Sequence, residues 1–286
     1  MAAAGDERNM AVFCDFENIA LGVREAKYDK FDIRRVLERL LVKGSIVVKR
    51  AYCDWERYKD YKAPMHEAAF ELIEIPHVRQ SGKNSADIRM VVDALDLCYT
   101  KSHVDTFVIV SGDSDFSPLV SKLRENNKEV IGCGVKKSTS DLLIASCDEF
   151  IYYDDLVREK ERESKRARKK PAKPKPVATK AAATEAVAPE AEEPEPDRAQ
   201  QAMDLLVSTF DALLSERGEG EKIWGSMIKQ TLKRRNPGFN ESYYGFKSFN
   251  SLLEEAKARG LLDLELDEKS GGFVVRAATH EVELAD

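Results

Sequence analysis

The sequence predicts an α/β fold for the first part of the chain, with a mostly parallel sheet flanked by helices, and a small second domain. Short apolar runs alternate with stretches of helical period through residues 8–157. Strands that alternate with helices are joined by crossovers, which build mostly parallel sheets. The chain has 286 residues, of which 43% are hydrophobic, so it is long enough for one large or two ordinary cores.

Six short apolar runs are expected to be the strands of the sheet: Ala11–Cys14, Ile46–Ala51, Ile73–Val78, Phe107–Val110, Val130–Gly134 and Phe150–Tyr153. Between them, apolar residues recur at helical spacing in four stretches: Ile33–Val42, Ile88–Tyr99, Pro118–Asn126 and Leu142–Cys147. Asp32 is expected to cap the first of these helices, and Gly44 follows its end. The boundaries of that helix therefore carry their own signals.

On the second predicted helix, the stripe expected to face the core consists of Ile88, Val91, Val92, Leu95 and Tyr99. At about 100° per residue, Asp87 lies on the flank of this stripe, whereas Asp93 points nearly opposite to it. Asp87 also stands in the first turn of the helix. Of the acidic residues on this helix, it is therefore the one expected to lie at the edge of the sheet.

The chain is expected to divide into four parts. An α/β domain spans residues 8–157, a disordered charged linker rich in Pro and Ala spans 158–197, a second domain spans 198–278, and an acidic tail spans 279–286. Six of the ten prolines lie in the linker, which has no apolar periodicity. Residues 1–157 hold 27 acidic against 22 basic residues, so any surface for nucleic acid must be a local patch.

The apolar runs are far shorter than the ~20 residues that a membrane-spanning helix needs. The five cysteines form no CxxC pair, and most of them lie inside apolar patterns. We therefore expect a soluble cytoplasmic protein with reduced thiols and no zinc site.

Four carboxylates fall where the predicted strands end or the following helices begin. Asp15 ends the first strand, Asp87 opens a helix, and Asp113 and Asp115 follow the strand Phe107–Val110. In an open parallel sheet these positions share one edge, where ligands bind. Asn18 and Ser111 stand beside the acids in the sequence.

Carboxylates that converge without a cation repel one another, and Mg²⁺ or Mn²⁺ relieves the conflict. A bound ion of this kind can activate water and neutralise a phosphodiester. A single Asp at such a position is more often a helix cap or a turn residue. Four of them at one predicted edge favour a metal site. Lys83 and Asn84, in the loop before Asp87, are candidates to contact a phosphate of RNA, although an exposed loop lysine needs no such role.

Five segments resemble the NYN domain, a branch of the PIN-like nucleases: Phe13–Asn18, Gly82–Asp87, Val110–Phe116, Val130–Gly134 and Cys147–Ile151. Their order and spacing cover nearly all of residues 10–155. The resemblance implies a PIN-like, Rossmann-like fold and an RNA nuclease that hydrolyses phosphodiesters with metal-activated water. It implies catalytic and metal-binding roles for Asp15, Asp87, Asp113 and Asp115, with Asn18 and Ser111 in support.

The second domain is predicted to be a winged helix, with three helices and a hairpin. Helical patterns occupy residues 199–214, Ile223–Leu232 and Phe246–Ala256, and two alternating runs, Leu261–Leu266 and Phe273–Val275, form the hairpin. Basic and aromatic residues at the second and third helices are candidates for RNA binding: Lys229, Lys233, Arg234, Arg235, Tyr243, Tyr244 and Lys247. The alternative is that the basic residues bind helix carbonyls and the tyrosines lie in the core.

Three segments of this domain resemble the OST-HTH or LOTUS domain: Trp224–Lys229, Asn236–Phe239 and Tyr244–Phe249. The resemblance covers about residues 198–277. It implies RNA binding and, in some branches of the family, docking of a helicase or another RNA-processing protein. An NYN domain followed by one LOTUS domain is similar to the arrangement in bacterial members of the NYN group.

The leading hypothesis is a Mg²⁺- or Mn²⁺-dependent ribonuclease whose tethered second domain binds RNA. The alternative is an RNA-binding adaptor with a catalytically silent acidic site. A phosphatase of the haloacid dehalogenase type is a distant third. That chemistry needs an Asp two residues after the nucleophile, which would be Asp15, and this chain has Glu17 there. It also needs Ser or Thr at the end of the second strand, where this chain has Ala51-Tyr52-Cys53.

Overall fold

The structure is a computed structural model that describes residues 8–75, 85–168, 195–217, 221–267 and 271–277. The chain divides into two compact units, Met1–Glu192 and Glu193–Asp286, and each is described by itself. No helix in these described ranges is long and apolar enough to cross a membrane.

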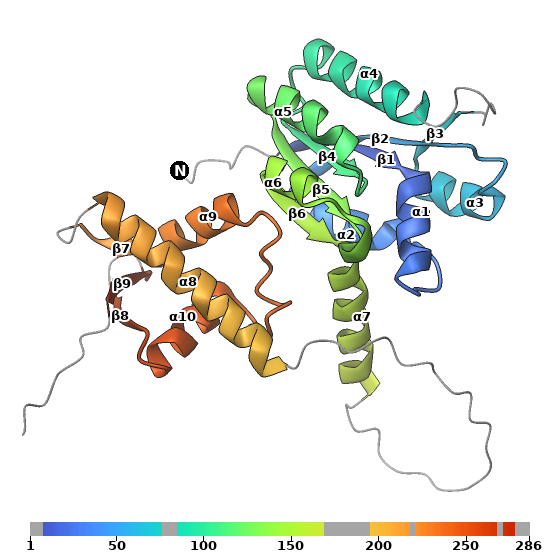
Figure 1. The fold of residues 1–286 in the computed structure, drawn as a ribbon. Helices are drawn as coiled ribbons and strands as arrows, with labels where there is room; N and C mark the ends of the chain where they lie inside the picture. The colour runs from blue at the N-terminus through green and yellow to red at the C-terminus, as the bar shows by residue number, and fades with distance from the viewer. Residues whose placement is uncertain (1–7, 76–84, 169–194, 218–220, 268–270, 278–286) are drawn as a thin grey trace, which may run out of the picture. The chain divides into compact units, whose positions relative to one another are not determined.

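The first unit is built on a six-stranded sheet in which every strand pair is parallel (Figure 1). Its strands are β1 (Asn9–Asp15), β2 (Ser45–Cys53), β3 (Glu71–Glu74), β4 (Thr106–Val110), β5 (Glu129–Gly134) and β6 (Glu149–Tyr152). Their order is β3-β2-β1-β4-β5-β6. The chain runs outward from β1 to β3 and then returns to the other side of β1, so the strand order reverses between β1 and β4. The predicted α/β fold is confirmed.

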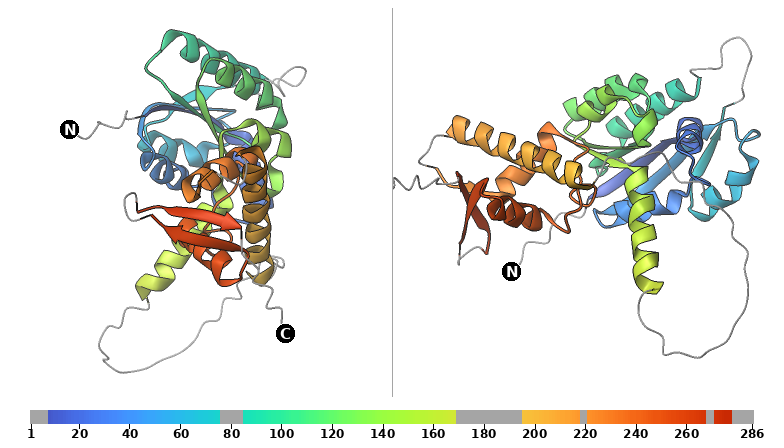
Figure 2. Two further views of the ribbon diagram at one scale, coloured as in Figure 1. Left: turned by 90° about the vertical axis from the view of Figure 1, so that its left-hand side faces the viewer. Right: turned by 60° about the horizontal axis from the view of Figure 1, so that its bottom comes forward.

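Helices cover both faces of this sheet (Figures 1 and 2). One face carries α1 (Phe16–Glu25), α2 (Ile33–Leu41), α3 (Lys59–Glu67) and α7 (Tyr153–Arg168), whose apolar side chains form one core with alternate residues of the strands. The other face carries α4 (Ser85–Thr100), α5 (Ser117–Glu125) and α6 (Asp141–Ser146), which form a second core. Two short 3₁₀ turns, η2 (Ser114–Phe116) and η3 (Lys136–Ser138), precede α5 and α6.

The sequence prediction for the buried face of α4 is wrong for three of its five residues. The helix packs on the sheet through Met90, Ala94, Leu97 and Cys98, with Val91 and Leu95 half-buried against the same core, whereas Ile88, Val92 and Tyr99 are exposed. Tertiary packing, and not the hydrophobicity of the stripe alone, therefore decides which face of α4 is buried. Asp93, predicted to point away from the core, accepts a hydrogen bond of 2.9 Å from the Tyr52 hydroxyl.

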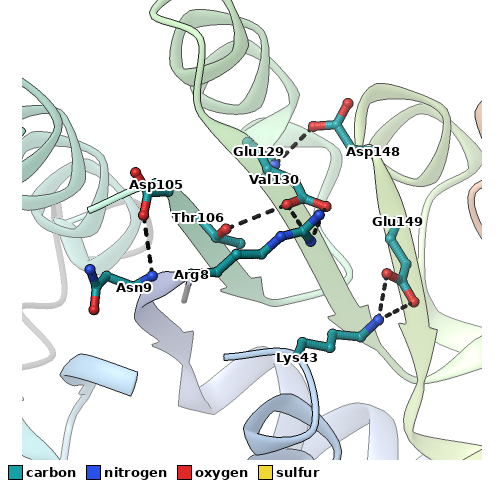
Figure 3. Close-up of polar contacts among 9 residues, drawn as sticks. All are labelled: Arg8, Asn9, Lys43, Asp105, Thr106, Glu129, Val130, Asp148 and Glu149. Carbon is teal, nitrogen blue, oxygen red and sulfur yellow. Dashed lines mark hydrogen bonds and ion pairs between the residues drawn. The ribbon is translucent and has the colours of Figure 1, made fainter. Parts of the chain in front are cut away.

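Ionic and polar contacts join the amino-terminal ends of the strands (Figure 3). Arg8 pairs with Glu129 at 2.7 Å, and Lys43 pairs with Glu149 at 2.7 Å. The backbone N–H of Asn9 donates to Asp105, which precedes β4. These contacts join β1 to β4 and β5, and the segment before β2 to β6, at the edge opposite to the ends that carry the predicted acids.

The second unit contains three helices and a small antiparallel sheet, which Figure 2 shows from two sides. The helices are α8 (Glu195–Arg217), α9 (Gly225–Arg235) and α10 (Phe249–Ala258). The sheet has the order β7-β9-β8, made of β7 (Ile223–Trp224), β8 (Leu262–Leu266) and β9 (Phe273–Ala277). The predicted hairpin is β8 with β9. Ile223 and Trp224, predicted as the start of the helix Ile223–Leu232, instead form β7, and α9 begins at Gly225, because two residues carry no alternation that would mark a strand.

The segment predicted as a linker contains helix at both ends. Helix α7 continues to Arg168, and α8 begins at Glu195. Residues 169–194, which include five of the six prolines used for that prediction, lie outside the described ranges.

Candidate functional site

The site begins where the two central strands end side by side. In the register of the sheet Cys14 of β1 lies beside Val110 of β4, so the next residues, Asp15 and Ser111, leave the sheet together. This is the point at which the strand order reverses. Such switch points are where open parallel sheets bind ligands, because the loops on either side diverge.

Hydrogen bonds join the residues that follow the two strands. The Ser111 hydroxyl donates to Asp15 Oδ2 at 3.0 Å and accepts from the backbone N–H of Asp113 at 3.2 Å. From the other side, Asn18 Oδ1 accepts from the backbone N–H of Gly112 at 2.9 Å. Asn18 and Ser111 therefore hold the loop after β4 against the start of α1.

Two of the acids also act as caps. Asp15 Oδ1 accepts from the backbone N–H of Asn18 at 3.4 Å and so begins α1 directly after β1. Asp113 Oδ1 accepts from the backbone N–H of Asp115 at 3.0 Å and begins η2. The capping alternative is thus correct for these residues, but capping accounts for one oxygen of each carboxylate and leaves the charge in place.

Gly112 is needed at its position because another segment passes close to it. A Cβ built on Gly112 would lie 2.5 Å from the carbonyl oxygen of Ser138, which is backbone. Any side chain here would push η3 away from the loop after β4. The glycine therefore keeps the loop in the place where it can hold Ser111 and Asp113.

Asp15 is a carboxylic acid in an unfavourable place for a negative charge. It is 6% exposed. Burial and, after it, the charge of Asp87 raise the pKa of its carboxyl to about 7, a value that already includes a partial offset by the hydrogen bond from Ser111. Near neutral pH this carboxyl is therefore divided between its neutral and ionised forms.

Asp87 lies in the first turn of α4 and is half-buried. Burial is the largest cause that raises the pKa of its carboxyl to about 6, and the charges of Asp113, Asp115 and Glu17 contribute in the same direction. The four predicted acids therefore act on one another electrostatically, although they come from three separate parts of the chain. Glu17, which the sequence analysis gave no role at this site, adds to the negative potential while pairing with Arg57 at 3.0 Å.

The donor set suits a hard divalent cation, because all the candidate ligands are carboxylate oxygens. Among the described residues, however, no group of three or more His, Cys, Asp or Glu side chains is arranged so that it could hold a metal ion together. Mg²⁺ commonly takes one or two carboxylates and keeps several waters. The residues therefore fit an ion held by two carboxylates, with the other acids acting through water, better than the predicted single nest of four.

The remaining predicted residues are placed as follows. Lys83 and Asn84 lie outside the described residues. In the second unit, Lys229 pairs with Glu241 at 2.9 Å, and the Arg235 guanidinium donates to the carbonyl of Ser208. Arg234 and Lys247 are exposed, and Lys233 is half-buried.

Tyr243 and Tyr244 lie before α10 and do not open it, because that helix begins at Phe249 after the Ser248 cap. Tyr244 stacks on Phe239 with ring centroids 5.1 Å apart and contacts Tyr243 edge to face. It packs against the core of the unit, as the alternative reading of these aromatic residues proposed.

The five cysteines are all buried and free of disulfides.

The fold and the acidic edge together define the class of the first unit: a parallel α/β domain of the PIN-like kind, with acids at the switch point of its sheet.

A sequence model of the NYN domain matches residues 9–154, and the chain therefore belongs to the NYN domain family. The chain is also 28% identical over 163 residues to an uncharacterized protein of Methanocaldococcus jannaschii, a match that covers 56% of this chain and 62% of that protein. The chain thus spans less than two thirds of that relative's length. A crystal structure of a protein of unknown function from Vibrio parahaemolyticus is similar over 54% of this chain and 97% of its own, with 27% identity and a TM-score of 0.48.

Proposed function

We propose that this protein is a metal-dependent ribonuclease that hydrolyses RNA phosphodiester bonds at the acidic edge of its sheet. The observation that supports the proposal is the electrostatic interaction of Asp15 with Asp87. These carboxyls come from different elements of an NYN domain, and their pKa values are raised to about 7 and about 6 by burial and by the charges of neighbouring acids. Such a site gains most from a cation, which stabilises the ionised form of both residues.

Asp15 and Asp87 are the proposed direct ligands of Mg²⁺ or Mn²⁺, with Asp113 and Asp115 acting through bound water. When bound, the ion would supply a more acidic water molecule and neutralise charge on a phosphodiester. The protein's own part is positional. Ser111 fixes one oxygen of Asp15, Asn18 holds the backbone of Gly112, and together they keep the loop that carries Asp113 beside β1.

The second unit is proposed to be a LOTUS-type winged helix that binds RNA. Its three helices, its small sheet and the segments that resemble the family support this, as do the exposed Arg234 and Lys247. Lys229 is already paired with Glu241, so its contribution depends on exchanging that partner for a phosphate. In this proposal residues 8–157 are the nuclease domain, 198–278 are the RNA-binding domain, and 158–197 tether the two. Docking of a helicase or another RNA-processing protein remains a prediction.

The test is incubation of the purified full chain with end-labelled RNA and DNA in Mg²⁺, Mn²⁺ or EDTA, followed by mapping of the product ends. We expect RNA cleavage with either metal and none in EDTA. Asp113→Asn should abolish cleavage, because Asn keeps the cap on η2 and removes the charge. The matched control is Asp141→Asn, an exposed Asp in the first turn of α6, which should cleave like the wild type.

The adaptor hypothesis makes the opposite prediction for the same experiment. Suppose that the full chain binds RNA, and that neither Mg²⁺ nor Mn²⁺ supports a cleavage that Asp113→Asn abolishes. The site is then silent and the protein is an adaptor. A residual activity that is equal in both variants would mark a contaminating nuclease.

A further inference from the structure

An apolar groove of about 720 Å³ lies on the helical face of the first unit, next to the acidic residues. It is formed by α4, the η2 turn, α5 and α6, which lie together on one side of the sheet (Figure 1). Its volume lies within the range of about 300–1,000 Å³ typical of small-molecule sites. Two of the proposed metal-site acids, Asp87 and Asp115, are part of its wall.

The apolar wall is made of side chains that the fold leaves uncovered. Ile88 is 62% exposed, Val92 55% and Leu142 60%. Single exposed apolar residues are common, but several that line one hollow mark a binding surface. This is also the stripe of α4 that its sequence would place in the core. The helix turns Met90 and Ala94 to the sheet and leaves Ile88 and Val92 to the groove.

The polar groups of the groove are hydroxyls and carboxylates. Ser114, Ser117, Ser121 and Ser146 contribute to the wall, and none of the described residues of the lining is Lys, Arg or His. The Ser117 residue is 6% exposed, and its hydroxyl is buried without a hydrogen-bond partner among the described residues. A buried hydroxyl in that state lacks a bond that a ligand in the groove can supply after rotation of the side chain.

We propose that this groove holds an unstacked base of a single-stranded RNA, next to the phosphodiester at the acidic site. The proposal rests on the proposed function, because it places the scissile phosphate at Asp87 and Asp115. A base has apolar faces for Ile88, Val92 and Leu142 and a polar edge for serine hydroxyls.

The groove's chemistry excludes the RNA backbone from the groove itself. A phosphate there would lie beside the carboxylates of Asp87 and Asp115, and no described residue of the lining offers it a cationic side chain. An uncharged base meets no such penalty. The same groove reaches Asp87 and Asp115. A nucleotide whose phosphate lies at these acids can therefore place its base in the groove. The substrate must be single-stranded RNA, since a base in a duplex is stacked and paired and cannot enter the groove.

The test uses single-stranded RNA oligonucleotides that each carry one abasic ribose, moved stepwise along the strand. Binding is measured by fluorescence anisotropy with the full chain carrying Asp113→Asn in Mn²⁺, so that RNA stays intact. One abasic position should weaken binding roughly tenfold, in line with the loss of one stacked base. In the same background Val92→Asn or Leu142→Asn should weaken binding of intact RNA by a similar factor and make that abasic position neutral.

The control is Val42→Asn, which changes an exposed valine outside the groove in the same way and should alter nothing. Ser117→Ala is expected to fold normally and to reduce the difference in affinity among the four bases at that position. Circular dichroism and size exclusion of each variant verify folding and oligomeric state.

The outcomes separate this inference from the proposed function. If the wild type cuts RNA while abasic position and groove substitutions are without effect, the inference fails and the nuclease stands. If the groove substitutions and the abasic position show the expected coupling but no metal supports cleavage, the base site stands and the nuclease fails. A change of oligomeric state on Val92→Asn, with unchanged RNA affinity, would assign the groove to a second copy of the chain and overturn the inference.

Discussion

Replacing Asp15 by Asn is expected to stabilise the metal-free protein at pH 8. The carboxyl of Asp15 has a pKa of about 7 in the folded protein, against 3.8 for an ordinary aspartate. The folded state therefore binds this proton more tightly than the unfolded state does. Consequently the free energy of unfolding falls as the pH rises from about 4 to about 7, and above pH 7 the full penalty is present.

The magnitude follows from the separation of the two pKa values. One pH unit corresponds to about 1.4 kcal/mol, so the ionised Asp15 lowers the free energy of unfolding by about 4 kcal/mol at pH 8. Asn can still cap α1 and keep a hydrogen bond with Ser111. The pKa of about 7 already includes the stabilisation of the charged carboxylate by these two hydrogen bonds, so the expected gain for Asp15→Asn at pH 8 stays at about 4 kcal/mol.

The assay is urea unfolding of the full chain in EDTA at pH 4.5 and pH 8, followed by tryptophan fluorescence. The chain has two tryptophans, and Trp55 is buried in the first unit whereas Trp224 belongs to the second. A Trp224→Phe background therefore reports on the first unit alone. Asp141→Asn serves as the control and should change the free energy of unfolding by less than about 0.5 kcal/mol.

The variant should lose its advantage at pH 4.5, where Asp15 is neutral in the folded wild type. Adding Mn²⁺ at pH 8 should stabilise the wild type more than Asp15→Asn. An ion that binds only the folded state raises the free energy of unfolding, and it does so more the tighter it binds. If Asp15→Asn is less stable than the wild type by the same amount at both pH values, the carboxyl does not carry the proposed penalty and the electrostatic reasoning is refuted.

Three further substitutions test the architecture around the site. Met90→Ala should lower the free energy of unfolding by about 2–4 kcal/mol, whereas Ile88→Ala should cost less than about 0.5 kcal/mol, as chemical denaturation can measure. Gly112→Ala should cost about 1–3 kcal/mol and reduce cleavage at saturating RNA, because the added methyl displaces η3 from the loop after β4. Lys43→Met should leave cleavage unchanged but lower the free energy of unfolding by about 1–3 kcal/mol, because the half-buried ion pair between Lys43 and Glu149 is lost.

Each of these three predictions has an outcome that contradicts it. Equal losses for the two α4 substitutions would mean that the helix packs through both stripes. Normal stability and cleavage in the Gly112 variant would show that the close approach of η3 is not needed. Reduced cleavage in a stably folded Lys43 variant would link the two edges of the sheet, which the fold keeps apart.

The strands of the first unit could be predicted because a parallel sheet is buried on both faces. Runs such as Phe107–Val110 are therefore apolar throughout and stand out from amphipathic neighbours. Helix α1 could not be predicted with the same ease, since it begins at Phe16 with no loop after β1 and contains Gly22. That glycine allows close packing against η3, because a Cβ there would lie 2.3 Å from the Ser138 hydroxyl, which would have to rotate away.

The positions of the acids could also be predicted, because strand order and direction decide which residues share an edge. Their detailed arrangement could not. Whether Asp15 and Asp87 lie close enough to share an ion depends on how α4 sits on the sheet, and the helical pattern indicated the wrong face. The hydrogen bond from Gly112 to Asn18 is likewise a result of tertiary packing, which no local pattern contains.

The central place of β1 bears on how the chain folds as it is made. This strand is made before the other strands of its sheet, yet it pairs with β2 on one side and with β4 on the other. Its edge toward β4 must therefore stay unpaired until translation has passed Val110. Pairing across such long separations is slow, and waiting strands are prone to aggregation. Truncations that end before β4 should therefore be insoluble during synthesis, and chaperones that hold nascent chains should engage this protein from its first strand.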